Sequence, residues 1–253
     1  MPQHKHDPYA ALRYPEFRSL VIASFLITNA QLVQEVVSGY ELYRITHNPL
    51  ALGLIGLVEA IPFISLTLFG GHVADKNSKR KILLWSTAVV SFSSLALHIA
   101  SRPEIHLSQP VFLLIIYSTV FVIGVCRAFY SPAVSSFRAF LIPMELYENA
   151  AMWSGSAWQV GAVAGPVMAG FFYAWFGFSN SLLAVVGLVL AVFFLYFSIG
   201  DKPISAASRE NNLLASIKEG IGFVFRTKII LYSISLDLFS VLFGGVMAIL
   251  PIY

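Results

Sequence analysis

The chain of 253 residues is too apolar for a soluble protein, because 57% of its residues are hydrophobic and only 11% are charged. A typical soluble domain is about 25% charged, and a fold of this length has too little interior to hide so much apolar surface. The formal net charge is only +3, and the basic residues do not line one solvated face, which excludes a nucleic-acid-binding protein. No strand-like alternation is present, so we predict an all-α integral membrane protein surrounded by lipid.

Seven stretches are apolar and long enough to cross a bilayer, which takes about 20 residues of helix. In chain order they span residues 19–40, 50–70, 82–100, 110–131, 146–175, 179–199 and 229–253. The turn sequence Gly177-Phe178-Ser179-Asn180 separates the fifth from the sixth. Residues 200–228 are rich in charge, and their apolar residues recur at helical spacing, which predicts an amphipathic helix on the membrane surface. These apolar residues are Leu213, Leu214, Ile217, Ile221 and Val224.

The basic residues between the predicted helices are unequally distributed, and this predicts an orientation. One set of connections carries Lys5, Arg13, Arg18, Lys76, Lys79, Arg80, Lys81, Arg138, Lys202, Arg209, Lys218, Arg226 and Lys228. The alternate set carries only Arg44 and Arg102. Because Lys and Arg collect in cytoplasmic connections, we predict a cytoplasmic N-terminus and a location in the plasma (inner) membrane.

Charge is concentrated between the second and third predicted helices, in the sequence GGHVADKNSKRK at residues 70–81. A topology signal explains the bases there, but neither the glycines nor the acid. The spacing is Gly71-x-x-x-Asp75-Lys76-x-x-Lys79-Arg80-Lys81. This 71–81 motif resembles the loop motif of the major facilitator superfamily, whose glycine lets helix ends pack closely and whose aspartate helps to latch one conformation. Ser78 stands where the second glycine of the family motif is expected, and two lysines replace arginines, which predicts a looser latch.

A second motif lies in the fifth predicted helix and reads GAVAGPVMAG at residues 161–170. This 161–170 motif resembles the G-x-x-x-G-P-x-x-G-G motif of the proton-driven exporters in the same superfamily, with Ala169 in place of one glycine. Gly161, Gly165 and Ala169 share one face with Ala157, so another helix can approach closely there. Pro166 loosens the helix locally, and Gly170 completes the motif. Ordinary tight packing would also account for the small residues alone.

Four further segments extend the resemblance along the chain. LRYPEFRSLVIASFLI, NPLALGLIG, SPAVSSFRAFLIP and LFGGVMAILPIY resemble the branch of the superfamily that contains the enterobactin exporter and macrolide efflux proteins. The resemblance implies the major facilitator fold, with twelve helices in two halves and a monomer as the active form. Residues 1–199 would then form the N-terminal six-helix half, 200–228 a cytoplasmic linker, and 229–253 the seventh helix, after which the chain looks truncated. A substrate path between two halves would be incomplete.

Four ionisable residues lie in the predicted spans, where a charge costs several kcal/mol unless it is paired or hydrated. Glu59 lies roughly 14 Å deep in the second span at 1.5 Å per residue, and we predict that it couples protons or binds substrate. Glu35 and Asp237 are further candidates, and each is also compatible with a boundary or structural role. For Arg127 we favour an interfacial anchor or a structural pair over substrate contact.

Enzyme motifs are absent from the sequence: it has no phosphate-binding loop and no H-E-x-x-H, and its six histidines show no metal spacing. We therefore predict no enzyme activity, no cofactor and no metal site. The predicted function is secondary active export of small molecules in exchange for protons, by alternating access. Two alternatives stay open: a non-transporting truncated scaffold or interaction protein, and an integral-membrane enzyme.

Overall fold

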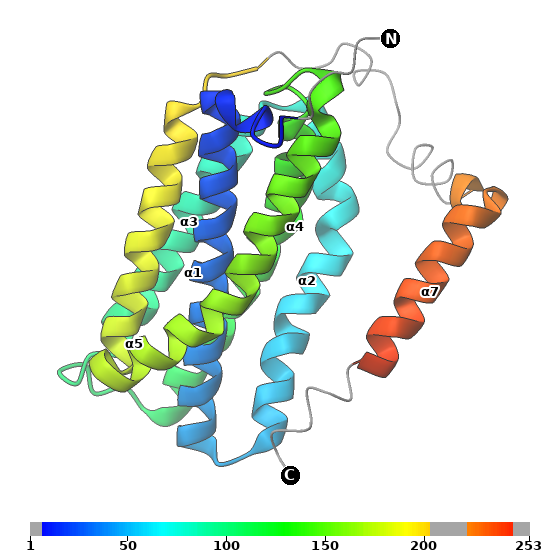
Figure 1. The fold of residues 1–253 in the computed structure, drawn as a ribbon. Coiled ribbons are helices and arrows are strands. Elements are labelled where there is room, and N and C mark those ends of the chain that lie inside the picture. Colours follow the sequence, from blue (N-terminus) through cyan, green and yellow to red (C-terminus); the bar gives the residue numbers. More distant parts are fainter. Residues whose placement is uncertain (1–6, 203–221, 245–253) are drawn as a thin grey trace, which may run out of the picture. The chain divides into compact units, whose positions relative to one another are not determined.

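The computed structural model describes residues 7–202 and 222–244, which are helical apart from short connections. The long helices in Figure 1 are α1 (Pro15–Thr46), α2 (Pro49–Lys76), α3 (Lys79–Ala100), α4 (Gln109–Arg138), α5 (Tyr147–Ser198) and α7 (Lys228–Gly244). Two 3₁₀ turns, η1 (Ala11–Arg13) and η2 (Met144–Leu146), precede α1 and α5. The chain forms two units, residues 1–206 and 207–253, and each is described by itself. For the described residues the all-helical prediction is confirmed.

Five helices of the described chain, α1 to α5, are long and apolar enough to cross a membrane. Proline at the first turn starts α1, α2 and α4, where its missing N–H has no helical partner in any case. The side chain of Asn48 caps α2 by accepting a hydrogen bond from the backbone N–H of Leu50 at 3.0 Å. His47, with φ of 48°, ends α1 in the left-handed conformation. These caps explain why only two residues separate α1 from α2.

The helix α5 contains both the fifth and the sixth predicted spans. Its single non-helical residue is Gly177, with φ of 71° and ψ of −179°, a conformation that a side chain would strain. The chain reverses direction there (Figure 1), at the first residue of the predicted turn. His98 on α3 contacts the carbonyl oxygen of Ser179 at 2.7 Å and so joins the turn to the end of α3. The turn divides α5 into two arms, residues 147–176 and 178–198.

The second unit is described only in part. Residues 222–226 are helical, and α7 runs from Lys228 to Gly244, so the described part of the seventh predicted span is shorter than the predicted 229–253. Four of the five apolar positions of the predicted amphipathic helix lie outside the described residues, as does most of the linker. The predicted surface helix is therefore untested.

The 71–81 motif was predicted in a loop, and this prediction is wrong. Asp75 and Lys76 lie on the last turn of α2, and α3 begins at Lys79, so only Asn77 and Ser78 connect the two helices. Ser78 starts α3 directly, because its Oγ accepts a hydrogen bond from the backbone N–H of Lys81 at 3.3 Å. Such a cap satisfies a helix N-terminus over a very short connection.

Close helix pairs organise the first unit: α1 packs on α5, α2 on α4, and α3 on both α4 and α5. A Cβ atom at Gly165 would lie 2.7 Å from Cβ of Leu32, so α5 approaches α1 at a distance that only glycine permits. Gly124 of α4 lies equally close to the Glu59 backbone of α2, and Gly70 of α2 to the Ala128 carbonyl of α4. Small residues thus determine how closely α5 approaches α1 and how closely α4 approaches α2, as is common in membrane helices.

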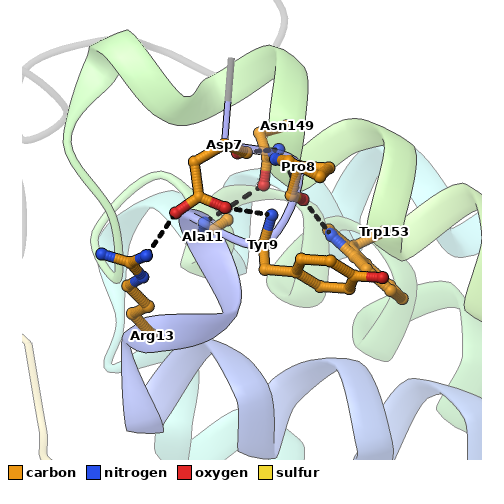
Figure 2. A network of polar contacts seen from close by, with 7 residues as sticks. All are labelled: Asp7, Pro8, Tyr9, Ala11, Arg13, Asn149 and Trp153. Carbon is orange, nitrogen blue, oxygen red and sulfur yellow. Dashed lines mark hydrogen bonds and ion pairs between the residues drawn. The ribbon is translucent and has the colours of Figure 1, made fainter. Parts of the chain in front are cut away.

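The N-terminal segment before α1 folds over the start of α5 (Figure 2). The Asn149 side chain accepts a hydrogen bond from the Ala11 N–H at 3.1 Å and donates to the Pro8 carbonyl at 2.8 Å. The indole N–H of Trp153 donates to the same Pro8 carbonyl at 2.8 Å, and its ring packs against Tyr9. Asp7 pairs with Arg13 at 2.6 Å and stiffens the segment. These bonds join the start of α1 to the start of α5.

Candidate functional site

An ion pair joins α2 and α4. The Nη1 atom of Arg127 donates to Oε1 of Glu59 at 2.7 Å, with the Glu59 side chain 16% exposed and that of Arg127 44% exposed. The guanidinium also lies over the Phe63 ring, 5.3 Å from its centroid. Phe63 follows Glu59 by one helical turn, so both contacts to Arg127 come from the same face of α2. Gly124, one turn before Arg127, allows α4 to come near enough for the pair to form.

Glu35 of α1 lies within electrostatic range of both Glu59 and Arg127. Its side chain is exposed on the surface of the first unit. Three of the four ionisable residues predicted from the sequence therefore gather at one place, on three different helices. The fourth, Asp237, is an exposed residue of α7 in the second unit. Arg127 forms an ion pair with Glu59, and its role as an anchor or structural pair stays a prediction.

A polar cavity of about 360 Å³ adjoins this cluster between α1, α4 and α5. Its polar lining consists of Ser24, Thr28, Gln31, Arg127, Tyr130, Ser131, Ser135, Arg138, Ser154 and Trp158. Arg127 is thus shared between the ion pair and the cavity. These hydroxyl, amide and guanidinium groups can form hydrogen bonds with water or with a polar ligand in the cavity.

Sequence reasoning missed most of the cavity, although a periodic pattern was present. Ser24, Thr28 and Gln31 follow one another at four and three residues on α1. On α4, the lining residues Arg127, Ser131, Ser135 and Arg138 likewise follow at intervals of four or three. This spacing places each set on one helix face. The pattern is easily overlooked because hydroxyl groups in helices also bond their own backbone, as Thr28 Oγ1 does with the Ser24 carbonyl at 2.8 Å.

The 161–170 motif packs α5 on α1 through some of its members. Gly161 and Gly165 lie against Thr28 and Leu32 of α1, and a Cβ at either would be crowded. A Cβ at Gly170 would meet nothing within 4 Å, so that glycine does not serve packing within the described residues. Pro166 lies inside the helix, which continues on both sides of it.

The bases of the 71–81 motif bind helix ends. Lys79 is buried, donates from Nζ to the Ala74 carbonyl at 3.0 Å and lies over the Phe140 ring. Arg80 donates to the carbonyl of Tyr196 at 3.3 Å and to that of Phe197 at 2.5 Å. Cations at helix C-termini are favoured by the free carbonyls and the helix dipole. Both bases therefore stabilise C-terminal helix ends.

The other members of this motif are less constrained. Asp75 and Lys76 are exposed, and in the described part of the chain Asp75 makes no ion pair. A Cβ at Gly71 would meet nothing within 4 Å, so the close approach expected of Gly71 belongs to Gly70 instead. No described residue of the first unit thus pairs with the Asp75 carboxylate, which also lies at the unfavourable, C-terminal end of α2.

A second polar cluster, which the sequence analysis did not identify, lies at the opposite end of the first unit. Glu41 is 5% exposed and accepts hydrogen bonds from Arg44 at 2.6 Å and from the Tyr173 hydroxyl at 2.8 Å. Glu41 and Arg44 are three residues apart and share one face of α1, so their ion pair could have been predicted from the sequence. The Tyr173 contact is not local and links α1 to α5.

Residues 6–253 match the family described as transmembrane secretion effector, within the major facilitator superfamily. The chain belongs to this family. It is also 22% identical over 209 residues to macrolide efflux protein A of Streptococcus pyogenes, which covers 80% of this chain and 49% of that protein. It is 26% identical over 182 residues to multidrug resistance protein 2 of Bacillus subtilis (strain 168), covering 69% of this chain and 43% of that protein. The chain spans about half the length of the curated relatives it matches.

As a member of this transporter family, the protein is a multi-pass membrane protein rather than an enzyme. The predicted resemblance to the superfamily and to its efflux branch is confirmed. The ion pair and cavity on α1, α2, α4 and α5 are accordingly a candidate transport site.

Proposed function

We propose that the protein is a secondary active transporter that exports small molecules in exchange for protons by alternating access. The observation that carries the proposal is the Glu59–Arg127 ion pair beside a polar cavity within membrane-spanning helices. A charge persists in lipid only where it is paired or hydrated, so such residues mark transport paths. Relatives named for macrolide efflux and multidrug resistance support export, and macrolides are the first substrates to test.

Simple charge arithmetic supports proton coupling at this cluster. With Glu35 and Glu59 ionised and Arg127 protonated, the three side chains carry a net charge of −1. One proton or one positively charged substrate group neutralises the cluster, whereas both together would leave a positive charge in the membrane interior. Binding of one therefore disfavours the other, which is the exclusion that an exchanger requires.

The transport cycle needs the Glu59–Arg127 pair to open and close. A proton on Glu59 removes the negative charge that holds the guanidinium, and Arg127 is then free to turn towards Glu35 or the cavity. Because Arg127 also lies over Phe63, it keeps one contact to α2 in either state. The pair thereby converts a protonation into a change in the direction of Arg127 between Glu59 and the cavity.

The complete transport path requires more than the first unit. We propose that the two arms of α5 each cross the membrane, giving a six-helix half in residues 1–199, followed by the linker 200–228 and a seventh helix from 229. A complete substrate path would need a second half as well, and Asp237 of the seventh helix is a further candidate for proton coupling or substrate binding. The distribution of basic residues supports a cytoplasmic N-terminus in the inner membrane, and the branch supports a monomer.

Asp75 fits a latch in this arrangement. Its carboxylate is exposed and forms no ion pair with any residue from 7 to 202. We propose that a helix N-terminus or a base of the second half holds it in one of the two facing states.

The test is efflux from cells that lack their own efflux pumps and express the natural full-length gene product. The parent protein should lower accumulation of at least one compound in a panel that includes macrolides, and a protonophore should abolish the effect. Glu59→Gln should abolish gradient-driven export, whereas Glu145→Gln, at an exposed carboxylate outside the cluster, should leave it unchanged. Export by Glu59→Gln at the parent rate and pH dependence would disprove the coupling role, and no export by the parent would disprove transport.

A further inference from the structure

The cavity between α1, α4 and α5 contains a second arginine, Arg138, whose side chain has no partner among the described residues. Arg138 lies on the last turn of α4 and lines the cavity. It forms no ion pair there, and its Nε is shielded from solvent without a hydrogen bond to any described residue. Arg127, the other arginine of the lining, is already neutralised by Glu59. None of the described lining residues is a carboxylate, so Arg138 leaves the cavity with one uncompensated positive charge.

A base at the end of α4 also suits a helix cap or a topology signal, but neither role accounts for the position of Arg138. Cations are favoured at helix C-termini because they bind the free carbonyl groups there. Lys79 and Arg80 do so, since both donate to carbonyls at helix ends. The Arg138 side chain donates to none of the described carbonyls. A topology signal explains a base at this end of the helix but not its place in a cavity lining.

Further hydrogen-bond donors of the lining lack an acceptor as well. The hydroxyl groups of Ser131 and Ser135 lie on the same face of α4 as Arg138, and α5 adds the Ser154 hydroxyl and the Trp158 indole N–H. None of these side chains forms a hydrogen bond within the part of the chain that the structure describes. Ser154 is only 9% exposed. A positive charge beside several free donors is the environment that an oxyanion requires, because it accepts many hydrogen bonds and donates none.

We propose that this cavity binds an acidic group of the transported compound, a carboxylate or another oxyanion, with Arg138 as its counter-ion. The hydroxyl groups of Ser131, Ser135 and Ser154 donate hydrogen bonds to it. The cavity of about 360 Å³ lies at the lower end of the range for small-molecule sites, so it holds the acidic end of a compound. The substrate class is small molecules with at least one acidic group, and naming the ligand a substrate rests on the proposed function.

An acidic group at Arg138 is compatible with the proposed proton exchange. Arg138 follows Arg127 by 11 residues, about 16 Å along α4 at 1.5 Å per residue. The acidic group neutralises Arg138 and leaves the net charge of −1 at Glu35, Glu59 and Arg127 for a proton or a basic group. A compound with one acidic and one basic group neutralises both places, so amphoteric compounds are the preferred substrates.

Two probes that differ only in their acidic group test the site by equilibrium dialysis. Dansylglycine carries a carboxylate, and dansylglycinamide carries an amide in its place. The purified natural full-length gene product in a non-ionic detergent should bind the acid at least about tenfold more tightly than the amide, as a charged hydrogen bond provides. Because binding is measured without a membrane or a gradient, the result is independent of efflux. A protein that prefers the acid but exports nothing would keep the oxyanion site and refute only transport.

Matched variants locate the binding of the acid. Arg138→Gln should reduce the affinity for dansylglycine to that for the amide, whereas Arg18→Gln, which removes an exposed base at the start of α1 outside the lining, should not. Ser135→Ala should weaken binding of the acid about two- to tenfold. Ser136→Ala is its control, because the Ser136 hydroxyl donates to the Pro132 carbonyl and does not line the cavity.

Size exclusion and an unchanged affinity for the amide show that each variant is folded. Equal affinities for acid and amide in the parent, or an unchanged preference for the acid in Arg138→Gln, would overturn the proposal. A lipid phosphate is the other source of an oxyanion at this site. Displacement of dansylglycine by added phosphatidylglycerol would assign the site to a lipid head group and overturn its assignment to a substrate.

Discussion

Replacing Gly124 by alanine tests whether the close approach of α2 and α4 determines the stability of the candidate site. A Cβ atom at Gly124 would collide with the backbone oxygen of Glu59 and lie 2.9 Å from Pro62 Cγ and 3.1 Å from Glu59 Cα. Ordinary contacts of such an atom are 3.4–4 Å. Two of the three obstacles are backbone atoms and the third belongs to a rigid ring, so none can rotate away. The helices must therefore move apart.

The expected loss follows from the cost of inserting a methyl group into a packed interface, about 1–3 kcal/mol. In a chain of 150–250 residues each kcal/mol corresponds to about 2–4 °C, so Gly124→Ala should lower the Tm by about 2–12 °C. Gly71→Ala is the matched control, because a Cβ there would meet nothing within 4 Å. Alanine is the better helix former by up to about 1 kcal/mol, so the control should unfold at the parent temperature or slightly above it.

Cys126 supplies the assay. It is the only cysteine of the chain, and its side chain is buried on α4, two residues from Gly124. A maleimide that becomes fluorescent on reaction with a thiol reports the exposure of Cys126 as the protein is heated in detergent. If Gly124→Ala and Gly71→Ala unfold at the same temperature, the helices are not held at the distance described, and the reasoning is refuted.

Three further predictions concern the motif, the orientation and the N-terminal segment. Asp75→Asn should change the free energy of unfolding by no more than a surface substitution does, within about 0.5 kcal/mol. It should nevertheless reduce efflux by the full-length protein at unchanged substrate affinity, and a proportional loss of affinity would contradict a latch. In a Cys126→Ser background, an impermeant thiol reagent added to intact cells should label a cysteine at Asn48 and not one at Asn77, and the reverse pattern would invert the orientation. Asn149→Ala removes three hydrogen bonds to the N-terminal segment, each contributing about 0.5–1.5 kcal/mol, and should speed cleavage of that segment in limited proteolysis; unchanged cleavage would show that Asn149 does not hold it.

The helices were largely predictable, because hydropathy reports directly on a lipid environment. Their ends were not, since the predicted first span of 19–40 became α1 from Pro15 to Thr46. Helical hydrogen bonding continues into the interface region, where polar residues such as Glu41 are tolerated and hydropathy falls. The same effect misplaced the 71–81 motif in a loop, because Asp75 and Lys76 are polar but still helical.

The pairing of helices could not be read from a single sequence. Glu59 and Arg127 are 68 residues apart, and neither spacing nor composition shows that α2 lies on α4. The depth of Glu59 was sufficient to mark it as a candidate, but its partner depends on Gly124, whose importance is visible only where the Glu59 backbone meets it. The sequence therefore identified the residues whose charges are unfavourable in lipid, and the packing of the helices determines which partners stabilise those charges.

The position of the candidate site follows from how the helix pairs are joined. Within the pair α2–α4, glycines bring the backbones into contact, and within α1–α5 they lie directly against side chains of α1, so each pair resists internal movement. Between the pairs, α1 makes few contacts with α2 or α4. Glu35 lies on one side of this junction and the Glu59–Arg127 pair on the other, and the cavity lies between α1, α4 and α5. Because α3 joins the two pairs through α4 and α5, we expect a change of charge at Glu59 to act first on the electrostatic energy at the α1 side of this junction, where Glu35 and the cavity lie and direct contacts are few.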